Sequence, residues 1–191
     1  MKQLQLLKLG ERERVLSTRD RGRVAADLIQ EALDKGSLVI SFADVEIATP
    51  SYLDEIVKRL GGLLRGNEER VVVITAANEE VADSLELVLG KHNMAIAAMQ
   101  DNQVRLLGGS AQLKKTLTAA QKLGTFSAAD LAEELELKLP NLHQRLKDLM
   151  ESGALAREPD ESAPRGKRHR YDAPSPSKLK TSKLKVLEAS C

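Results

Sequence analysis

The chain has 191 residues, which allows one large domain or two small ones. Its single cysteine is Cys191, so no intrachain disulfide is expected. No apolar run approaches the roughly 20 residues that a membrane span needs, and early charges at Lys2 and Lys8 do not fit a signal peptide. We therefore expect a cytoplasmic protein that does not contact membranes. Aromatic side chains are scarce, with two Tyr and two Phe, which argues against stacking single-stranded bases.

The formal net charge of +1 is unevenly distributed along the chain. Residues 1–109 hold 14 Lys+Arg against 17 Asp+Glu, a net of −3. Residues 110–174 hold 11 against 10, a net of +1, and residues 175–191 hold 4 against 1, a net of +3. Basic character is therefore local, in a short arm at 165–170 and in the last 17 residues.

The first 108 residues alternate between strand and helix patterns. Strands are predicted at 2–9, 38–42, 70–75, 94–99 and 103–107, and helices at 17–35, 50–64 and 79–89. Ser17 and Asn78 are predicted helix caps, and Gly36 and Gly90 are predicted stops. This order predicts an α/β domain over residues 1–108, a sheet with packed helices. Gly108 and Gly109 form the expected joint to a second domain.

The segment ISFADVEIATPSYLDEIV, residues 40–57, combines a strand, a Val-containing loop and a Ser-bearing turn that starts a helix. It resembles the STAS and STAS-like domains of bacterial signalling proteins, over residues 12–100. In the anti-sigma-factor antagonists of that family, a partner kinase phosphorylates a serine at this helix start, and Ser51 occupies that position. Thr49, Pro50 and Tyr52 depart from the pattern, so the resemblance better implies a sensing or interaction module, with Ser51 as a helix cap.

The second half begins with a helical pattern at 111–123 and continues with two shorter helices. Ser127 and Asp130 form a capping-box pattern. Pro140 suits the first position of the next helix, and Gly153 suits its end. Two short strands at 154–158 and 167–172 then flank a turn-rich stretch, and the second strand carries a cluster of cations.

This order of parts resembles the winged helix-turn-helix domain of ArsR- and MarR-type bacterial regulators, over residues 109–174. The resemblance implies a mainly α domain whose second short helix enters the DNA major groove. Steps of about 100° per residue turn Gln144, Lys147 and Asp148 fully outward and put Asn141 and His143 on the flanks. The expected DNA-binding residues are Asn141, His143, Gln144, Lys147, Arg165, Lys167, Arg168 and Arg170. Winged helices also bind proteins, so the resemblance alone does not establish DNA binding.

Motifs for catalysis or metal binding are not found in the sequence. The three histidines have no metal-ligand spacing, and no phosphate-binding glycine loop occurs. The pair Asp54 and Glu55 is interpreted as solvated surface charge. No enzyme activity, cofactor or metal is expected.

The sequence thus predicts a transcriptional regulator that binds double-stranded DNA through its second domain and senses, dimerises or binds a partner through its first. A homodimer is expected, held by the first domain or by the helix at 111–123. Residues 175–191 are expected to be a flexible basic tail. The alternative is a partner-switching adaptor in which the winged helix binds a signalling protein and a kinase phosphorylates Ser51.

Overall fold

The computed structural model describes residues 2–6, 14–160, 169–176 and 185–186. Within them the chain forms six helices and eleven strands. The helices are α1 (Arg19–Asp34), α2 (Pro50–Leu64), α3 (Glu79–Lys91), α4 (Ala111–Leu123), α5 (Ala128–Glu134) and α6 (Leu139–Glu151). The strands are β1 (Lys2–Gln5), β2 (Val15–Leu16), β3 (Leu38–Ser41), β4 (Ile47–Ala48), β5 (Val72–Thr75), β6 (Ala95–Gln100), β7 (Gln103–Gly108), β8 (Thr125–Phe126), β9 (Ala156–Pro159), β10 (His169–Asp172) and β11 (Lys185–Val186).

Six strands form one mostly parallel sheet in the order β11-β1-β3-β5-β6-β7. Only the β6–β7 pair is antiparallel, because the two strands are joined by a tight turn at Asp101 and Asn102. Both turn residues have positive φ, which Asn and Asp adopt more readily than other side chains. The mixed α/β class that the sequence predicts is confirmed.

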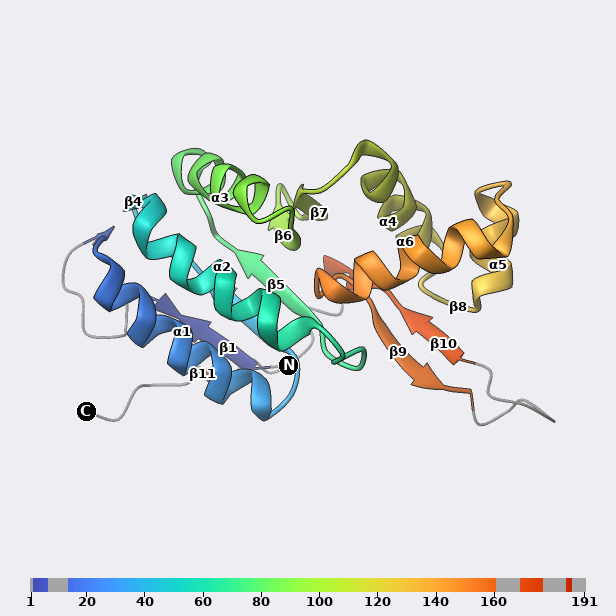
Figure 1. The fold of residues 1–191 in the computed structure, drawn as a ribbon, viewed down its shortest axis with the longest axis horizontal. Coiled ribbons are helices and arrows are strands. Elements are labelled where there is room, and N and C mark those ends of the chain that lie inside the picture. The colour runs from blue at the N-terminus through green and yellow to red at the C-terminus, as the bar shows by residue number, and fades with distance from the viewer. Residues whose placement is uncertain (1, 7–13, 161–168, 177–184, 187–191) are drawn as a thin grey trace.

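One face of this sheet packs against three helices. Side chains that alternate along each strand, such as Leu38 and Ile40 in β3 and Val72 and Ile74 in β5, join one apolar cluster with α1, α2 and α3. The period of two follows from the pleat, which turns successive side chains to opposite faces. Figure 1 shows α1 and α2 side by side in front of the strands, with α2 between α1 and α3.

The opposite face of the sheet belongs to a second apolar cluster. Val39 in β3, Val73 in β5 and Ala97 in β6 point to this side. The same cluster contains the buried side chains of α4, α5 and α6 and of the strands that follow them. The C-terminal half, which lies at the right of Figure 1, therefore shares its apolar core with the sheet.

Backbone contacts join the two halves near the start of β5. The Val72 N–H donates to the carbonyl of Gly153, just after α6, at 3.0 Å. The Arg157 N–H in β9 donates to the Glu68 carbonyl at 2.7 Å, and the two side chains form an ion pair. The central strand of the sheet is thus tied directly to the end of α6.

Most predicted elements agree with the structure, and several of their ends differ. Thr18, not Ser17, is the N-cap of α1. Helix α3 continues through Gly90 to Lys91, because the backbone of His92 closes it instead. Helix α6 begins at Leu139, one residue before Pro140, since Lys138 already has the extended backbone of an N-cap.

Short strands were not predicted. The parallel pair β2–β4 and strand β8 have two residues per strand, too few for an alternation pattern. Within the segment expected to be a flexible basic tail, Lys185–Val186 pairs with β1 as β11. Among the described residues, no helix is both long and apolar enough to cross a membrane.

The contact between β5 and the end of α6 predicts an effect of a methyl group at Gly153. This residue has φ 68°, and an added Cβ would lie 3.1 Å from the Val72 Cβ and amide nitrogen. We expect Gly153→Ala to lower the free energy of unfolding by about 1–2 kcal/mol, measured by urea denaturation. The matched control is Gly62→Ala in α2, where the added methyl meets open space and should stabilise by about 0.5–1 kcal/mol. An unchanged stability of Gly153→Ala would contradict the tight contact.

Candidate nucleic-acid interface

Helix α6 is fixed by its apolar side. Leu142, Leu146, Leu149 and Met150 are buried in the second cluster, as their spacing predicts. Arg145, half-buried, ties the helix to α4 through its guanidinium, which donates to the Thr116 hydroxyl at 3.4 Å and to the Gln112 side chain at 3.3 Å. The orientation of α6 is therefore set by both packing and side-chain hydrogen bonds.

Helix α5 precedes α6 and starts at the predicted capping box. The Ser127 hydroxyl accepts from the Asp130 N–H at 3.3 Å, and the Asp130 carboxylate accepts from the Ser127 N–H at 2.8 Å. The backbone N–H of Ser127, followed by its hydroxyl, lowers the pKa of the Asp130 carboxyl. The capping box is confirmed.

The opposite side of α6 is polar and faces solvent. Asn141, His143, Gln144 and Lys147 are all exposed. The Gln144 amide nitrogen donates to Asp148 at 2.8 Å, and the Lys147 ammonium lies 3.8 Å from Glu151. Asp148 is half-buried, so its predicted fully outward position is wrong. It lines a small cavity beside Arg65 of the loop after α2.

The two ends of α6 differ in their acidic residues. No Asp or Glu occurs from Leu137 to Lys147, whereas Asp148 and Glu151 lie in the last turns. Leu139, the first residue of the helix, is 44% exposed, although apolar side chains of its size are mostly buried in this protein. This exposure was not predicted, since nothing in the sequence distinguishes Leu139 from a buried leucine.

Strands β8, β9 and β10 form a small antiparallel sheet beside the helices, in the order β8-β10-β9. Phe126 in β8 and Tyr171 in β10 stack with ring centroids 5.7 Å apart. Arg170 in β10 is exposed, and its guanidinium lies 3.9 Å from the Asp160 carboxylate. The predicted DNA-binding residues Arg165, Lys167 and Arg168 lie outside the described residues. Of the eight predicted residues, the structure thus places five.

Ser51 lies in the first turn of α2, far from these residues along the chain. Thr49 is the N-cap, and its side chain makes no capping hydrogen bond, so the prediction that Ser51 is the cap is wrong. The Ser51 hydroxyl is 3.2 Å from the Thr49 hydroxyl, and the Ser51 side chain is half-buried.

Helix α2 contains a buried carboxylate that the sequence does not predict. Asp54 has only 4% of its side chain exposed, so the interpretation of the pair Asp54 and Glu55 as solvated charge is wrong for Asp54. Four cationic or basic side chains reach its oxygens: Lys58 at 2.7 Å, His92 at 2.7 Å, Arg19 at 3.2 Å and Lys91 at 3.3 Å. Because these come from α1, α2 and the end of α3, Asp54 joins three helices.

The hydrogen bond from Lys58, followed by that from His92, holds the pKa of the Asp54 carboxyl well below its ordinary value of 3.8. Burial acts in the opposite direction and is outweighed. The residues around Asp54 are basic, so the group has no set of acidic ligands for a metal. Across the described parts of the chain, no three His, Cys, Asp or Glu side chains gather in a metal-binding group.

Comparison with known proteins adds no family assignment. The chain matches no model of a protein family. No curated protein is matched to it either.

The lowered pKa of Asp54 predicts how stability depends on pH. A carboxyl whose folded-state pKa is depressed stabilises the fold above its unfolded pKa, and this stabilisation is lost as pH falls below about 4. Asp54→Asn should therefore lower the free energy of unfolding at pH 7 by about 1–3 kcal/mol. The difference from the unmodified protein should shrink between about pH 4 and pH 2. Urea denaturation across this range measures both.

Asp83→Asn is the control for that experiment, because Asp83 is an exposed carboxylate on α3. This substitution should change the free energy of unfolding by no more than about 0.5 kcal/mol at every pH. A difference for Asp54→Asn that is the same at pH 2 and pH 7 would show that its charge does not stabilise the fold.

Proposed function

We propose that this protein is a transcriptional regulator that binds duplex DNA through α6. In this proposal α4, α5 and α6 with strands β8, β9 and β10 form a winged helix-turn-helix unit, and α6 is its recognition helix. Residues 1–108 form a STAS-like domain that senses a signal, dimerises or binds a partner. The observation that carries the proposal is the polar, solvent-facing side of α6, opposite a fully buried apolar side.

The geometry of α6 fits the major groove. That groove is about 12 Å wide and accepts a single helix with its side chains. Recognition helices usually approach the bases with their N-terminal residues. In α6 this is the end without acidic residues, so phosphates would not repel it. The acidic Asp148 and Glu151 lie at the other end, away from the proposed contact.

Individual side chains have distinct expected roles. The amide groups of Asn141 and Gln144 can pair with adenine through two hydrogen bonds. Lys147 and Arg170, exposed and cationic, suit phosphate oxygens, and their loose ion pairs of 3.8 and 3.9 Å cost little to exchange. The sequence places three more cations, Arg165, Lys167 and Arg168, just before β10.

We further propose a homodimer, because two copies reading two half-sites bind more tightly and specifically than one. The N-terminal half suits this contact better than α4. Apolar side chains are exposed there at Val24 in α1, 57%, and Leu87 in α3, 68%. The apolar side of α4 is already buried against the sheet.

The proposal predicts that different residues of α6 contact the bases and the phosphates of the DNA. Asn141→Ala and Gln144→Ala should each cost about 1–3 kcal/mol on a specific duplex and little on a scrambled one, because uncharged groups release no counterions. Lys147→Ala should weaken both duplexes similarly and lower the salt dependence by about 0.9 in slope. Competition titrations of the full chain, with the duplex upstream of its own coding region, measure these effects.

Two outcomes of those titrations would count against the proposal. One is equal and weak binding to specific and scrambled duplexes. The other is an unchanged affinity in all three variants. Either result would favour the alternative in which this half of the chain binds a protein.

Leu139 predicts a second test of the same helix end. Its exposed side chain can contact the 5-methyl group of thymine, an apolar feature of the major groove. Replacing a contacted thymine by uracil removes that methyl, worth about 0.8 kcal/mol or about fourfold in affinity. We expect this loss for the unmodified chain and none for Leu139→Ala. Ile47→Ala, which truncates an exposed isoleucine on β4, is the control and should retain the loss.

A further inference from the structure

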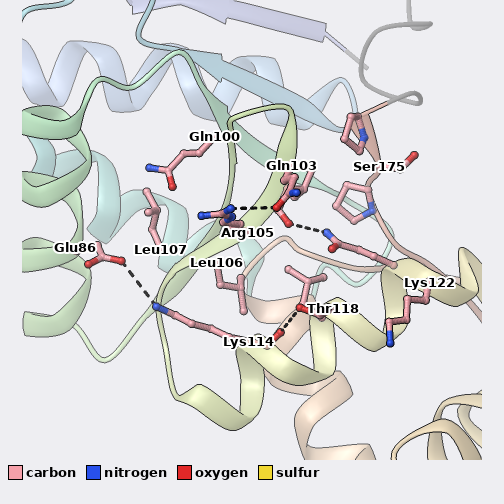
Figure 2. Close-up of a pocket in the computed structure, with 15 residues that line it drawn as sticks. Glu86, Gln100, Gln103, Arg105, Leu106, Leu107, Lys114, Thr118, Lys122 and Ser175 are labelled. Atoms are coloured by element: carbon pink, nitrogen blue, oxygen red, sulfur yellow. Dashed lines mark hydrogen bonds and ion pairs between the residues drawn. The ribbon is translucent and has the colours of Figure 1, made fainter.

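A cavity of about 690 Å³ lies between strand β7, helix α4 and the segment Pro174–Pro176 (Figure 2). Strand β7 is an edge of the six-stranded sheet, so one wall of the cavity is a strand without a neighbouring strand on that side among the described residues. The cavity is within the range of about 300–1,000 Å³ that small-molecule sites occupy. Its walls come from both halves of the chain.

The inner wall of this cavity is apolar. Val104 and Leu106 of β7 and Leu117 of α4 are buried and line it, and Pro174 closes one side. These side chains offer a surface for the carbon skeleton of a ligand. Burying such a skeleton contributes about 25 cal/mol for each Å² removed from water.

The rim of the cavity is cationic. Arg105, Lys114 and Lys122 line it against one carboxylate, Glu86, so three positive charges face one negative charge, a net of +2. The N-terminal half around it has the opposite balance, with 14 Lys+Arg against 17 Asp+Glu. The positive charge of the lining therefore does not follow from the average composition of the N-terminal half.

Two of these cations are only loosely paired. The Lys114 ammonium lies 3.9 Å from Glu86, and the Lys122 ammonium lies 3.7 Å from Glu134. Both lysines are largely exposed, and exposed pairs contribute at most about 1 kcal/mol. An anion in the cavity can therefore replace the carboxylates of Glu86 and Glu134 as the partner of these lysines. Arg105 is held on the strand by a hydrogen bond to the Gln103 side chain at 3.1 Å, as Figure 2 shows.

An amide group completes the polar rim. The Gln121 side chain nitrogen donates to the Val104 carbonyl of the edge strand at 2.9 Å. This bond fixes the amide at the cavity wall and satisfies a carbonyl that β6 does not reach. Gln100 and Gln103 add two further amides on the β6–β7 side.

We propose that this cavity binds a small organic anion, a molecule with a carboxylate, sulfonate or phosphate group on an apolar body. The anionic group lies at Arg105 and Lys114, and the apolar body lies on Leu106 and Leu117. The occupant contacts the edge of the sheet and the first helix of the C-terminal half together. This binding does not depend on the proposed DNA binding, and the two are tested separately.

The test uses the full chain and a pair of fluorescent probes that differ in charge. 8-Anilinonaphthalene-1-sulfonate has an anionic sulfonate on an aromatic body, and N-phenyl-1-naphthylamine has the same body without it. The double variant Arg105→Gln with Lys114→Gln should weaken sulfonate binding by about tenfold or more, because it removes both anion partners. Binding of the neutral probe should change less than about twofold, because the apolar wall is retained.

Two variants complete the experiment. Lys115→Gln changes the same charge on α4 at an exposed residue outside the lining, and it should leave both probes unaffected. Thr118→Trp places a large side chain in the cavity and should weaken both probes. Sulfonate binding that survives the double variant, that is lost equally in Lys115→Gln, or that is absent from the unmodified chain would overturn the proposal.

Discussion

The rest of the structure depends on one requirement, that the second apolar face of the sheet be covered as well as the first. A mostly parallel sheet is apolar on both sides and needs both covered. Helices α1, α2 and α3 cover one side, and the other shares a single apolar cluster with α4, α5 and α6. The hydrogen bond from Val72 to Gly153 fixes the end of α6 against the central strand. Strand β11 adds a second connection, since residues near the C-terminus extend the sheet beside β1.

This packing connects the proposed DNA-binding helix with the proposed ligand-binding cavity. A helix that must present its polar side to DNA needs a rigid support, and here that support is the sheet of the other half. The start of β9 is held in the same way, through Arg157 and Glu68. A ligand in the cavity beside β7 touches α4, which is tied to α6 by Arg145. The proposed ligand site and the proposed DNA-binding helix are therefore connected by one shared apolar core and not by a flexible joint.

The sequence predicts the long elements well because their signals are local. Periodic leucines, the capping box at Ser127 and the glycine at 153 each act within one or two turns, so a short stretch of sequence contains the whole signal. Strands of two residues such as β2 and β4 have no such signal, and they exist because the tertiary fold brings them together. The same holds for β11, whose partner lies at the opposite end of the chain.

In the candidate sites, too, local sequence signals predict some features and long-range packing determines the others. The outward positions of Gln144 and Lys147 follow from helical periodicity, so sequence alone predicts them. The burial of Asp54 does not, because its partners Arg19 and His92 come from other helices and are distant in sequence. Asp148 departs from the periodic expectation for a similar reason, since the end of α6 packs near α2 and the start of α4. Long-range packing decides whether a charge is solvated, and periodicity does not contain that information.

Selection from a library of random DNA duplexes with the full chain tests the central claim most directly. If the polar side of α6 reads bases and the protein acts as a dimer, repeated rounds should enrich one sequence motif. That motif should contain two half-sites whose centres are about one helical turn, roughly 10 base pairs, apart or a multiple of it. Selection at about 50 mM and again at about 200 mM salt separates base reading from phosphate attraction. A selected pool with the composition of the starting library at both salt concentrations would contradict the account.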